Sequence, residues 1–342
     1  MNYPIFTKEH QSLMAKYLNI GIYNHLKDLK SKNGFSLEKA INSGLKNPDS
    51  GIGVYAGDEE SYTLFAALFD NIIEDYHGFT KEDKHISNLN ASYLKAPLLE
   101  EHNKYILSTR IRVGRNLKDF PLGPAISDIQ RKEIEEIVSK ALNHLKHDLK
   151  GKYYALNALS KKEQARLIKD HFLFKEGDRF LQAASLNNDW PNSRGIFHNT
   201  EKTFLVWINE EDQLRIISMQ EGGDIKAVFS RLLKAIHLLE EHMQFSYNDH
   251  LGYITSCPTN LGTAMRASVH IKLPKLSLDM KEYKKITDKY FLQIRGIHGE
   301  HSKSEGGIYD ISNKRRLGVS EVQCVQDMYD GVSALIKKEE SL

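Results

Sequence analysis

The stretch from Cys257 to Pro274 begins as a turn and continues as an alternating segment. Pro258 fixes its own φ, and Asn260 and Gly262 tolerate the backbone conformations of a tight corner. Beyond the turn, one side carries Ala267, Val269, Ile271 and Leu273, and the other carries Arg266, Ser268, His270 and Lys272. Because side chains of a strand alternate between two faces, this pattern predicts a half-buried strand that follows a cysteine-bearing loop.

The same alternation occurs elsewhere in the chain. Segment 105–115 places Thr109, Ile111 and Val113 on one face and Ser108, Arg110 and Arg112 on the other. The apolar runs 203–209 and 213–220 enclose a polar turn at 209–212, which indicates a hairpin. Further strands are expected at 290–295 and 308–312.

Helices are indicated by capping residues followed by apolar residues at helical spacing. We expect helices that begin after Ser36, after Asp224 and after Ser320, and another through 60–76. Ser127 with Gln130 and Ser160 with Glu163 have the spacing of capping boxes. The helix after Ser127 is expected to be long and to be closed by Gly151.

The character of the chain changes along its length. The first hundred residues show only short helices and loops, whereas strands and helices mix beyond residue 105. This order indicates the α+β class. The polar run 80–90 is the candidate linker, because few apolar residues there could anchor it to a core.

Composition narrows the class of protein. The 47 basic and 45 acidic residues nearly balance, which argues against a dedicated nucleic-acid binder. No apolar run is long enough to span a membrane, and the opening residues lack the order of a secretory signal. Two cysteines make neither a disulfide framework nor a metal cluster. We therefore expect a cytoplasmic protein without nucleic-acid or membrane partners.

Arginines recur at matching positions of the predicted strands: Arg110, Arg112, Arg215, Arg266 and Arg295. Neighbouring guanidinium groups at ~8 Å would repel by roughly 2 kcal/mol per pair at an effective dielectric constant of about 20. Each arginine by itself is more simply explained by a nearby carboxylate or by solvent. Five in one phase favour a bound polyphosphate, because the planar guanidinium suits phosphate oxygens. The glycine-rich phosphate loop and the protein-kinase motifs are both absent from the sequence.

Several motifs together resemble the phosphagen (ATP:guanidino) kinase family, over essentially the whole chain. The most specific is Cys257-Pro258-Thr259-Asn260-Leu261-Gly262-Thr263, and 108–112, 172–180, 209–212 and 306–316 also match. The resemblance implies a small all-helical N-terminal domain and a larger domain with an antiparallel sheet flanked by helices. On this basis we divide the chain into residues 1–85, a linker at 86–104, and a catalytic ATP-binding domain at 105–342.

The resemblance also implies the chemistry and the residues that perform it. The reaction would be reversible transfer of the ATP γ-phosphoryl group to a guanidino nitrogen, with Mg²⁺ held mainly by nucleotide oxygens and water. The catalytic set would be Glu211, Cys257, Glu300, Arg215, Arg266 and Arg295. ATP or ADP would be bound by Ser108, Thr109, Arg110, Ile111, Arg112, His171, Arg215, Arg266, Ala267, Ser268, Val269, His270, Arg295, Gly296, Ile297, His298, Gly299 and Glu300. The guanidino substrate would be bound by Ser50, Gly51, Ile52, Gly53, Val54, Tyr55, Glu211, Cys257 and Glu300.

Each assignment has a physical reason. A protonated guanidinium is a poor nucleophile, so carboxylates such as Glu211 and Glu300 must orient it and accept its proton. Without the resemblance, a solvated turn and a mobile loop would explain these two glutamates. A cysteine beside several arginines is expected to be a thiolate near neutral pH. Cys324 is expected to be a buried structural thiol. The resemblance places the segments of Asp49 and Arg179 opposite each other across the domain interface, so we expect an ion pair between them that holds the substrate loop closed.

The short loop before Tyr55 and the presence of Glu300 resemble family members specific for L-arginine. Kinases of smaller guanidines carry a longer loop at this place. Two alternatives stay open: a kinase for another guanidine such as taurocyamine or lombricine, and a regulatory protein that binds ATP without turnover. A protein-arginine kinase is disfavoured, because the N-terminal domain is complete. Whether the protein is a monomer or a homodimer also stays open.

Overall fold

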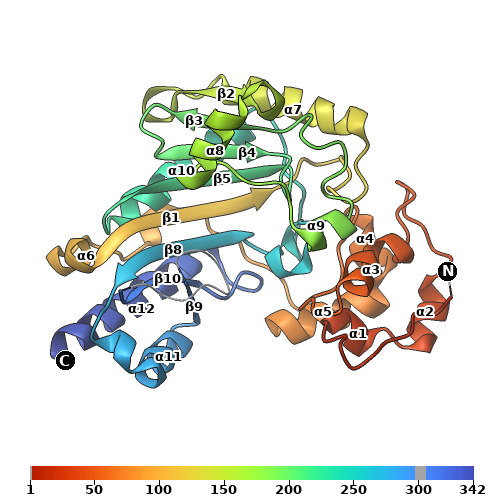
Figure 1. The fold of residues 1–342 in the computed structure, drawn as a ribbon, viewed down its shortest axis with the longest axis horizontal. Helices are drawn as coiled ribbons and strands as arrows, with labels where there is room; N and C mark the ends of the chain where they lie inside the picture. The colour runs from red at the N-terminus through yellow and green to blue at the C-terminus, as the bar shows by residue number, and fades with distance from the viewer. Residues whose placement is uncertain (1, 297–305) are drawn as a thin grey trace.

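The computed structural model describes residues 2–296 and 306–342, and its main feature is an eight-stranded antiparallel sheet (Figure 1). The strand order is β2–β3–β4–β5–β1–β8–β10–β9. The strands are β1 (Ile106–Arg115), β2 (Gly151–Ala155), β3 (Gly195–Asn199), β4 (Phe204–Ile208), β5 (Leu214–Glu221), β8 (Met265–Lys272), β9 (Leu292–Arg295) and β10 (Ile308–Asn313). A separate small hairpin joins β6 (Tyr247–Asn248) and β7 (Gly252–Tyr253). The strands expected from alternation are thus confirmed. The expected hairpin is also confirmed, and it is formed by β4 and β5.

One face of the sheet is covered by long amphipathic helices. Helix α10 (Ile225–Glu240) packs on β5 and β1, α12 (Glu321–Ser341) packs on β8 and β10, and α7 (Asp128–Leu142) packs on β2 and β3. The apolar sides of the strands meet these helices in the largest buried cluster. The polar sides of β1, β5 and β8 therefore face away from this core.

Short helices complete the larger part of the chain. These are α6 (Glu100–Tyr105), α8 (Lys161–Lys169), α9 (Arg179–Ala183) and α11 (Met280–Lys289), with 3-10 turns η1 (Ala91–Tyr93), η2 (His147–Leu149), η3 (Leu156–Ala158), η4 (Pro258–Asn260) and η5 (Leu276–Leu278). Helix α9 lies between the sheet and the N-terminal helices (Figure 1). It is one of the places where the two parts of the chain meet.

The regular elements described in the N-terminal part are helices: α1 (Leu13–Tyr17), α2 (Ile20–Leu26), α3 (Leu37–Lys46), α4 (Glu60–Leu64) and α5 (Ala66–His77). Figure 1 shows them grouped on one side of the molecule. Their buried cluster also includes Leu122, Leu251, Ile254, Leu261 and Leu317 from the larger part. The described residues thus show an all-helical part beside an antiparallel sheet flanked by helices, which confirms the fold class. None of the helices in the described segments is long and apolar enough to cross a membrane.

Helix starts were predicted better than helix ends. Both capping boxes and the caps at Ser36, Asp224 and Ser320 are present. The helix after Ser127 ends at Leu142, however, and Gly151 instead begins β2, so its expected end was wrong. The helix expected through 60–76 is two helices, because the chain bends at Phe65 (φ −104°, ψ 25°), which is fully buried.

The polar run 80–90 is held by polar contacts that its composition does not show. The buried carboxylate of Glu321, at the start of α12, accepts hydrogen bonds from the hydroxyl of Ser87 and from the backbone N–H of Asn88 at 2.8–3.0 Å. The side chains of Leu94 and Ala96 are buried in the main core. The segment beyond residue 86 therefore packs along α12, and the domain division stays a prediction.

Candidate active site

The register of the sheet brings the five arginines to one face. Arg112 lies opposite Arg266, and Gly114, two residues further along the same face, lies opposite Arg215. Asp310 pairs with His270 on one side and with Arg295 on the other, which continues this face to β9. Since Arg110 has the phase of Arg112, all five belong to one polar face, as the alternation predicted.

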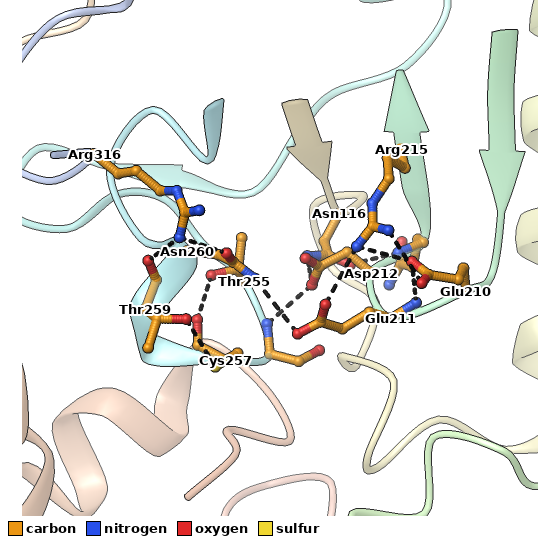
Figure 2. A network of polar contacts seen from close by, with 12 residues as sticks. Asn116, Glu210, Glu211, Asp212, Arg215, Thr255, Cys257, Thr259, Asn260 and Arg316 are labelled. Atoms are coloured by element: carbon orange, nitrogen blue, oxygen red, sulfur yellow. Dashed lines mark hydrogen bonds and ion pairs between the residues drawn. The ribbon is translucent and has the colours of Figure 1, made fainter. Parts of the chain in front are cut away.

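Carboxylates of the protein itself neutralise part of this charge (Figure 2). Arg215 contacts Glu210 at 2.9 Å and Glu211 at 3.3 Å, all three being more than four-fifths buried. Arg266 donates to Asp310 at 2.8 Å. The simpler explanation considered above, pairing with a nearby carboxylate, therefore holds for these two arginines.

Arg110 and Arg112, the two arginines that β1 contributes to this face, are in a less favourable environment. Burial, and then the charges of Arg215 and Arg266, lower the pKa of Arg110 to about 10 and also lower the pKa of Arg112. The Nε and Nη2 atoms of Arg110 are buried and make no hydrogen bond within the described residues. Its guanidinium lies 5.4 Å from the ring centre of Trp207. An anion bound on this face would satisfy these donors and reduce the mutual repulsion.

Glu211 lies at the end of the arginine face nearest to the cysteine loop (Figure 2). Its Oε1 accepts from Nδ2 of Asn260 at 3.4 Å. Burial, and then the neighbouring carboxylate of Asp212, raise the pKa of Glu211 to about 7. Asp212 is itself held by Asn116 and by the backbone N–H of Ser256. A carboxyl group with such a pKa is suited to exchange protons near neutral pH.

The cysteine of the loop differs from the thiolate expected from the sequence. The Sγ atom of Cys257 lies 3.1 Å from the hydroxyl of Thr259, and the residue is 6% exposed. Burial, and then the charge of Glu211, raise the pKa of this thiol to about 12. The expectation of a thiolate was wrong, because burial disfavours the charged form of the thiol and the carboxylate of Glu211 adds to this effect. Cys324 is a buried thiol, as expected.

The loop that carries Tyr55 reaches the same place from the N-terminal helices. Tyr55 and Cys257 belong to one buried apolar cluster, and Ile52 packs against it. The backbone N–H of Ala56 donates to the carbonyl of Ser256 at 2.8 Å. Ser50, Gly53 and Val54 are buried, while Gly51 is exposed. The structure thus brings the expected substrate loop, Cys257 and Glu211 together.

The residues expected to bind the nucleotide divide into two groups. Ser108, Ser268 and His270 lie on the arginine face, and His171 is close enough to His270 to contribute to lowering its pKa, of which burial is the main cause. The side chains of the second group lie in the core on the opposite face: Thr109, Ile111, Ala267 and Val269. Gly296 is buried at the end of β9. Ile297, His298, Gly299 and Glu300 lie outside the described residues.

The expected ion pair between Asp49 and Arg179 is present. The Nη1 atom of Arg179 donates to Oδ1 of Asp49 at 2.8 Å, and Nη2 contacts the other oxygen. Nη1 also donates to Oδ1 of Asn47 at 3.0 Å. This confirmed contact joins the start of the substrate loop to α9.

Sequence reasoning missed Arg316 and the counter-ions Glu210, Asp212 and Asp310. Arg316 donates to the carbonyl of Thr259 at 2.7 Å and to the side chain of Asn260 at 3.0 Å (Figure 2). A small cavity is lined by Arg112, Gly114, Asp212, Arg215, Asn260, Ala264, Arg266 and Arg316. Arg316 lies in a matched motif but not on an alternating strand, so the strand phase could not reveal it.

Comparison with known proteins identifies the class to which this fold and site belong. Residues 8–74 match the N-terminal domain of the ATP:guanido phosphotransferases, and residues 133–342 match their C-terminal catalytic domain. The chain belongs to this family.

Individual relatives refine the comparison. An arginine kinase of Artemia franciscana is 55% identical over 332 residues, which cover 97% of this chain and 93% of that protein. The crystal structure of a lombricine kinase superimposes with a TM-score of 0.94 at 40% identity, covering 99% of this chain and 94% of the other. The duplicated taurocyamine kinase from Schistosoma mansoni, with bound transition-state-analogue components, gives 0.91 at 42% identity. That match covers 97% of this chain and 47% of the longer one.

Proposed function

We propose that this protein is an arginine kinase, which reversibly transfers the γ-phosphoryl group of ATP to the guanidino group of L-arginine. The observation that carries the proposal is the convergence of Glu211, Cys257 and the Tyr55 loop at one end of a face with five arginines. A polyanion fits one end of this arrangement, and a planar cation fits the other. The 55% identity to an arginine kinase over nearly the whole chain favours L-arginine as that cation.

The residues would share the work of an in-line transfer. Arginines of β1, β5 and β8 hold the phosphates and stabilise the charge of the transferring group, which needs positioning more than covalent help. Glu211 orients the guanidinium and accepts its proton, for which a pKa of about 7 is suitable. Glu300 is proposed as the second carboxylate, on the family resemblance alone.

The thiol would act as an electrostatic partner. A guanidinium bound between Glu211 and Cys257 would lower the pKa of the thiol, since an opposite charge favours the thiolate. Direct in-line transfer leaves no phosphoryl group for the thiol to accept. We therefore assign Cys257 a role in holding the substrate and no covalent step.

Magnesium fits this site as a partner of the nucleotide. Asp310 and Glu210, the carboxylates beside the arginine face, are ion-paired with Arg266 and Arg215, so they are poorly placed to hold a cation by themselves. Mg²⁺ would be held by phosphate oxygens and water, and it would neutralise phosphate charge when bound. We also propose a cytoplasmic location, with the protein acting as a monomer or a homodimer.

A coupled assay of ADP formation from ATP tests the proposal. L-Arginine is expected to give the highest kcat/KM in a panel with creatine, taurocyamine and lombricine. Preference for taurocyamine or lombricine would keep the family chemistry but overturn the substrate. ATP binding without turnover of any guanidine would favour the regulatory alternative.

A further inference from the structure

A third segment, just beyond α9, packs at the place where the substrate loop contacts the cysteine loop. Ala184 and Leu186, just beyond α9, share one buried cluster with Tyr55 and Cys257. Leu186 is 1% exposed, so its contacts are with protein atoms. Neither residue belongs to the expected site, because both are apolar and lie outside the matched motifs.

Leu186 is closely enclosed on the side of Glu211. A Cβ atom added at Gly123 would lie 2.2 Å from Cδ2 of Leu186 and 3.0 Å from the carbonyl oxygen of Glu211. The absence of a side chain at Gly123 therefore leaves room for Leu186 beside a residue that also neighbours the backbone of Glu211. Leu186 thus shares a buried cluster with Tyr55 and Cys257 and also lies beside Gly123, which neighbours the backbone of Glu211.

The backbone of this segment is fixed from the larger part of the protein. Nη2 of Arg194 donates to the carbonyl oxygens of Leu186 and Asn188, both at 2.9 Å. Arg194 is 1% exposed, so these bonds are shielded from water. Hydrogen bonds from a buried charged donor are stronger than neutral ones, and they hold the carbonyl of Leu186 in place.

The same segment is also fixed from the N-terminal helices. Nδ2 of Asn42 donates to the carbonyl of Ala183 at 2.6 Å, and the hydroxyl of Ser43 donates to the carbonyl of Phe180 at 2.8 Å. These donors belong to α3, which lies directly before the substrate loop. The position of Leu186 relative to Tyr55 is therefore set by both parts of the chain.

We propose that Leu186 is a positioning residue that sets the separation between Tyr55 and Cys257, and thereby the length of the guanidino side chain that the site accepts. The inference rests on the proposed function, in which Cys257 and Glu211 hold the guanidino end and the Tyr55 loop covers the amino-acid end. A shorter side chain at residue 186 would leave room for Tyr55 or Cys257 to move apart. A substrate with one more methylene would then fit better relative to L-arginine.

The test compares L-arginine with L-homoarginine, which is one methylene longer, in Leu186→Ala. We expect the ratio of kcat/KM for homoarginine to that for arginine to rise by on the order of tenfold, the scale of discrimination that one methylene provides. The KM for ATP should stay unchanged, because the arginine face is untouched. Equal losses for both substrates would show a merely structural role and overturn the inference.

Three controls keep the result decisive. Leu156→Ala removes a leucine of the same burial from a separate cluster and should leave the ratio unchanged. Leu186→Met nearly conserves volume and should also keep the ratio. If Leu186→Ala does not fold, Leu186→Val should shift the ratio in the same direction by less, and an unchanged ratio there overturns the inference.

Failure of this inference is distinguishable from failure of the proposed function. If the parent protein phosphorylates a guanidine other than arginine, the comparison is made with that guanidine and its homologue one methylene longer. A parent without activity on any guanidine contradicts the function. An active parent whose ratio does not respond to Leu186→Ala contradicts only the positioning role.

Discussion

Burial dominates the acid–base state of the two side chains at the guanidino end of the site. Burial, and then the carboxylate of Asp212, raise the pKa of Glu211 to about 7, while burial, and then the charge of Glu211, raise the pKa of Cys257 to about 12. A cationic substrate would reverse this effect. The site is therefore arranged so that binding a guanidinium generates the charges that hold it.

This leads to a prediction for the pH dependence of stability. Because the pKa of Glu211 is raised from 4.5 to about 7 in the folded protein, the folded state holds this proton more tightly than the unfolded state. The stabilisation is therefore full below pH 4.5 and is lost as the pH rises through about 7. The difference between the two pKa values corresponds to at most about 3 kcal/mol.

Glu211→Gln should remove this loss of stability with rising pH. Urea unfolding of the parent and the variant across that pH window measures the difference between their free energies of unfolding. Glu133→Gln, at an exposed position of α7, is the matched control and should follow the parent. Parallel curves for the parent and Glu211→Gln would mean that the carboxyl group titrates at its ordinary pKa.

At the scale of strands, alternation predicted which side chains share a face of the sheet. Which side chains lie next to each other on adjacent strands depends on the register between those strands. The phase of Arg110, Arg112 and Arg266 could be read from the sequence, because the side-chain period of a strand is fixed at two. That Asp310 lies beside Arg266 follows only from the pairing of β10 with β8. The counter-ion Asp310 was missed for this reason.

Removing one arginine of this face should lower kcat/KM more than it lowers the stability of the fold. Arg266→Ala is expected to lose about 3 kcal/mol of transition-state stabilisation, roughly a hundredfold in kcat/KM, because a positioned donor to the phosphates is gone. It also leaves Asp310 without its partner beside the bound anion. Arg231→Ala on α10, which covers the opposite face of the sheet, is the control and should keep near-parental kcat/KM. Near-parental activity of Arg266→Ala would contradict the role of the face.

The other differences between the predicted and the observed structure arise from tertiary packing, which the sequence of a single helix or strand does not show. The caps of α3, α7 and α8 follow from local side-chain chemistry, so they could be predicted. The bend at Phe65 and the protonated state of Cys257 depend on burial, which tertiary packing decides. Leu186 and Arg194 lie outside the matched motifs, and no local pattern marks them.

At the scale of the molecule, the two parts of the chain are joined both by apolar packing and by a set of polar contacts around α9. The core of the N-terminal helices continues into loops of the larger part. Beside it, α3 donates to carbonyls of α9, and the Asp49–Arg179 pair links the start of the substrate loop to the same helix. Both charged side chains are more than half exposed. We therefore expect the ion pair to contribute little to folding and to act on closure of the loop over substrate.

Breaking this pair should affect the guanidino substrate and spare the nucleotide. Asp49→Asn is expected to raise the KM for L-arginine and to lower kcat, while the affinity for ATP changes little, because the pair joins the substrate loop to α9 and neither residue is expected to bind the nucleotide. Asp75→Asn, which breaks the exposed Lys16–Asp75 pair within the N-terminal helices, is the matched control and should keep parental kinetics.

The charge-swapped variant, Asp49→Arg with Arg179→Asp, should recover part of the loss, since the attraction is restored with its partners exchanged. Added salt should narrow the differences among these variants, because exposed charges are screened. If the double variant is no better than the worse single variant, direct pairing does not position the loop, and the α3 contacts to α9 remain as the alternative link.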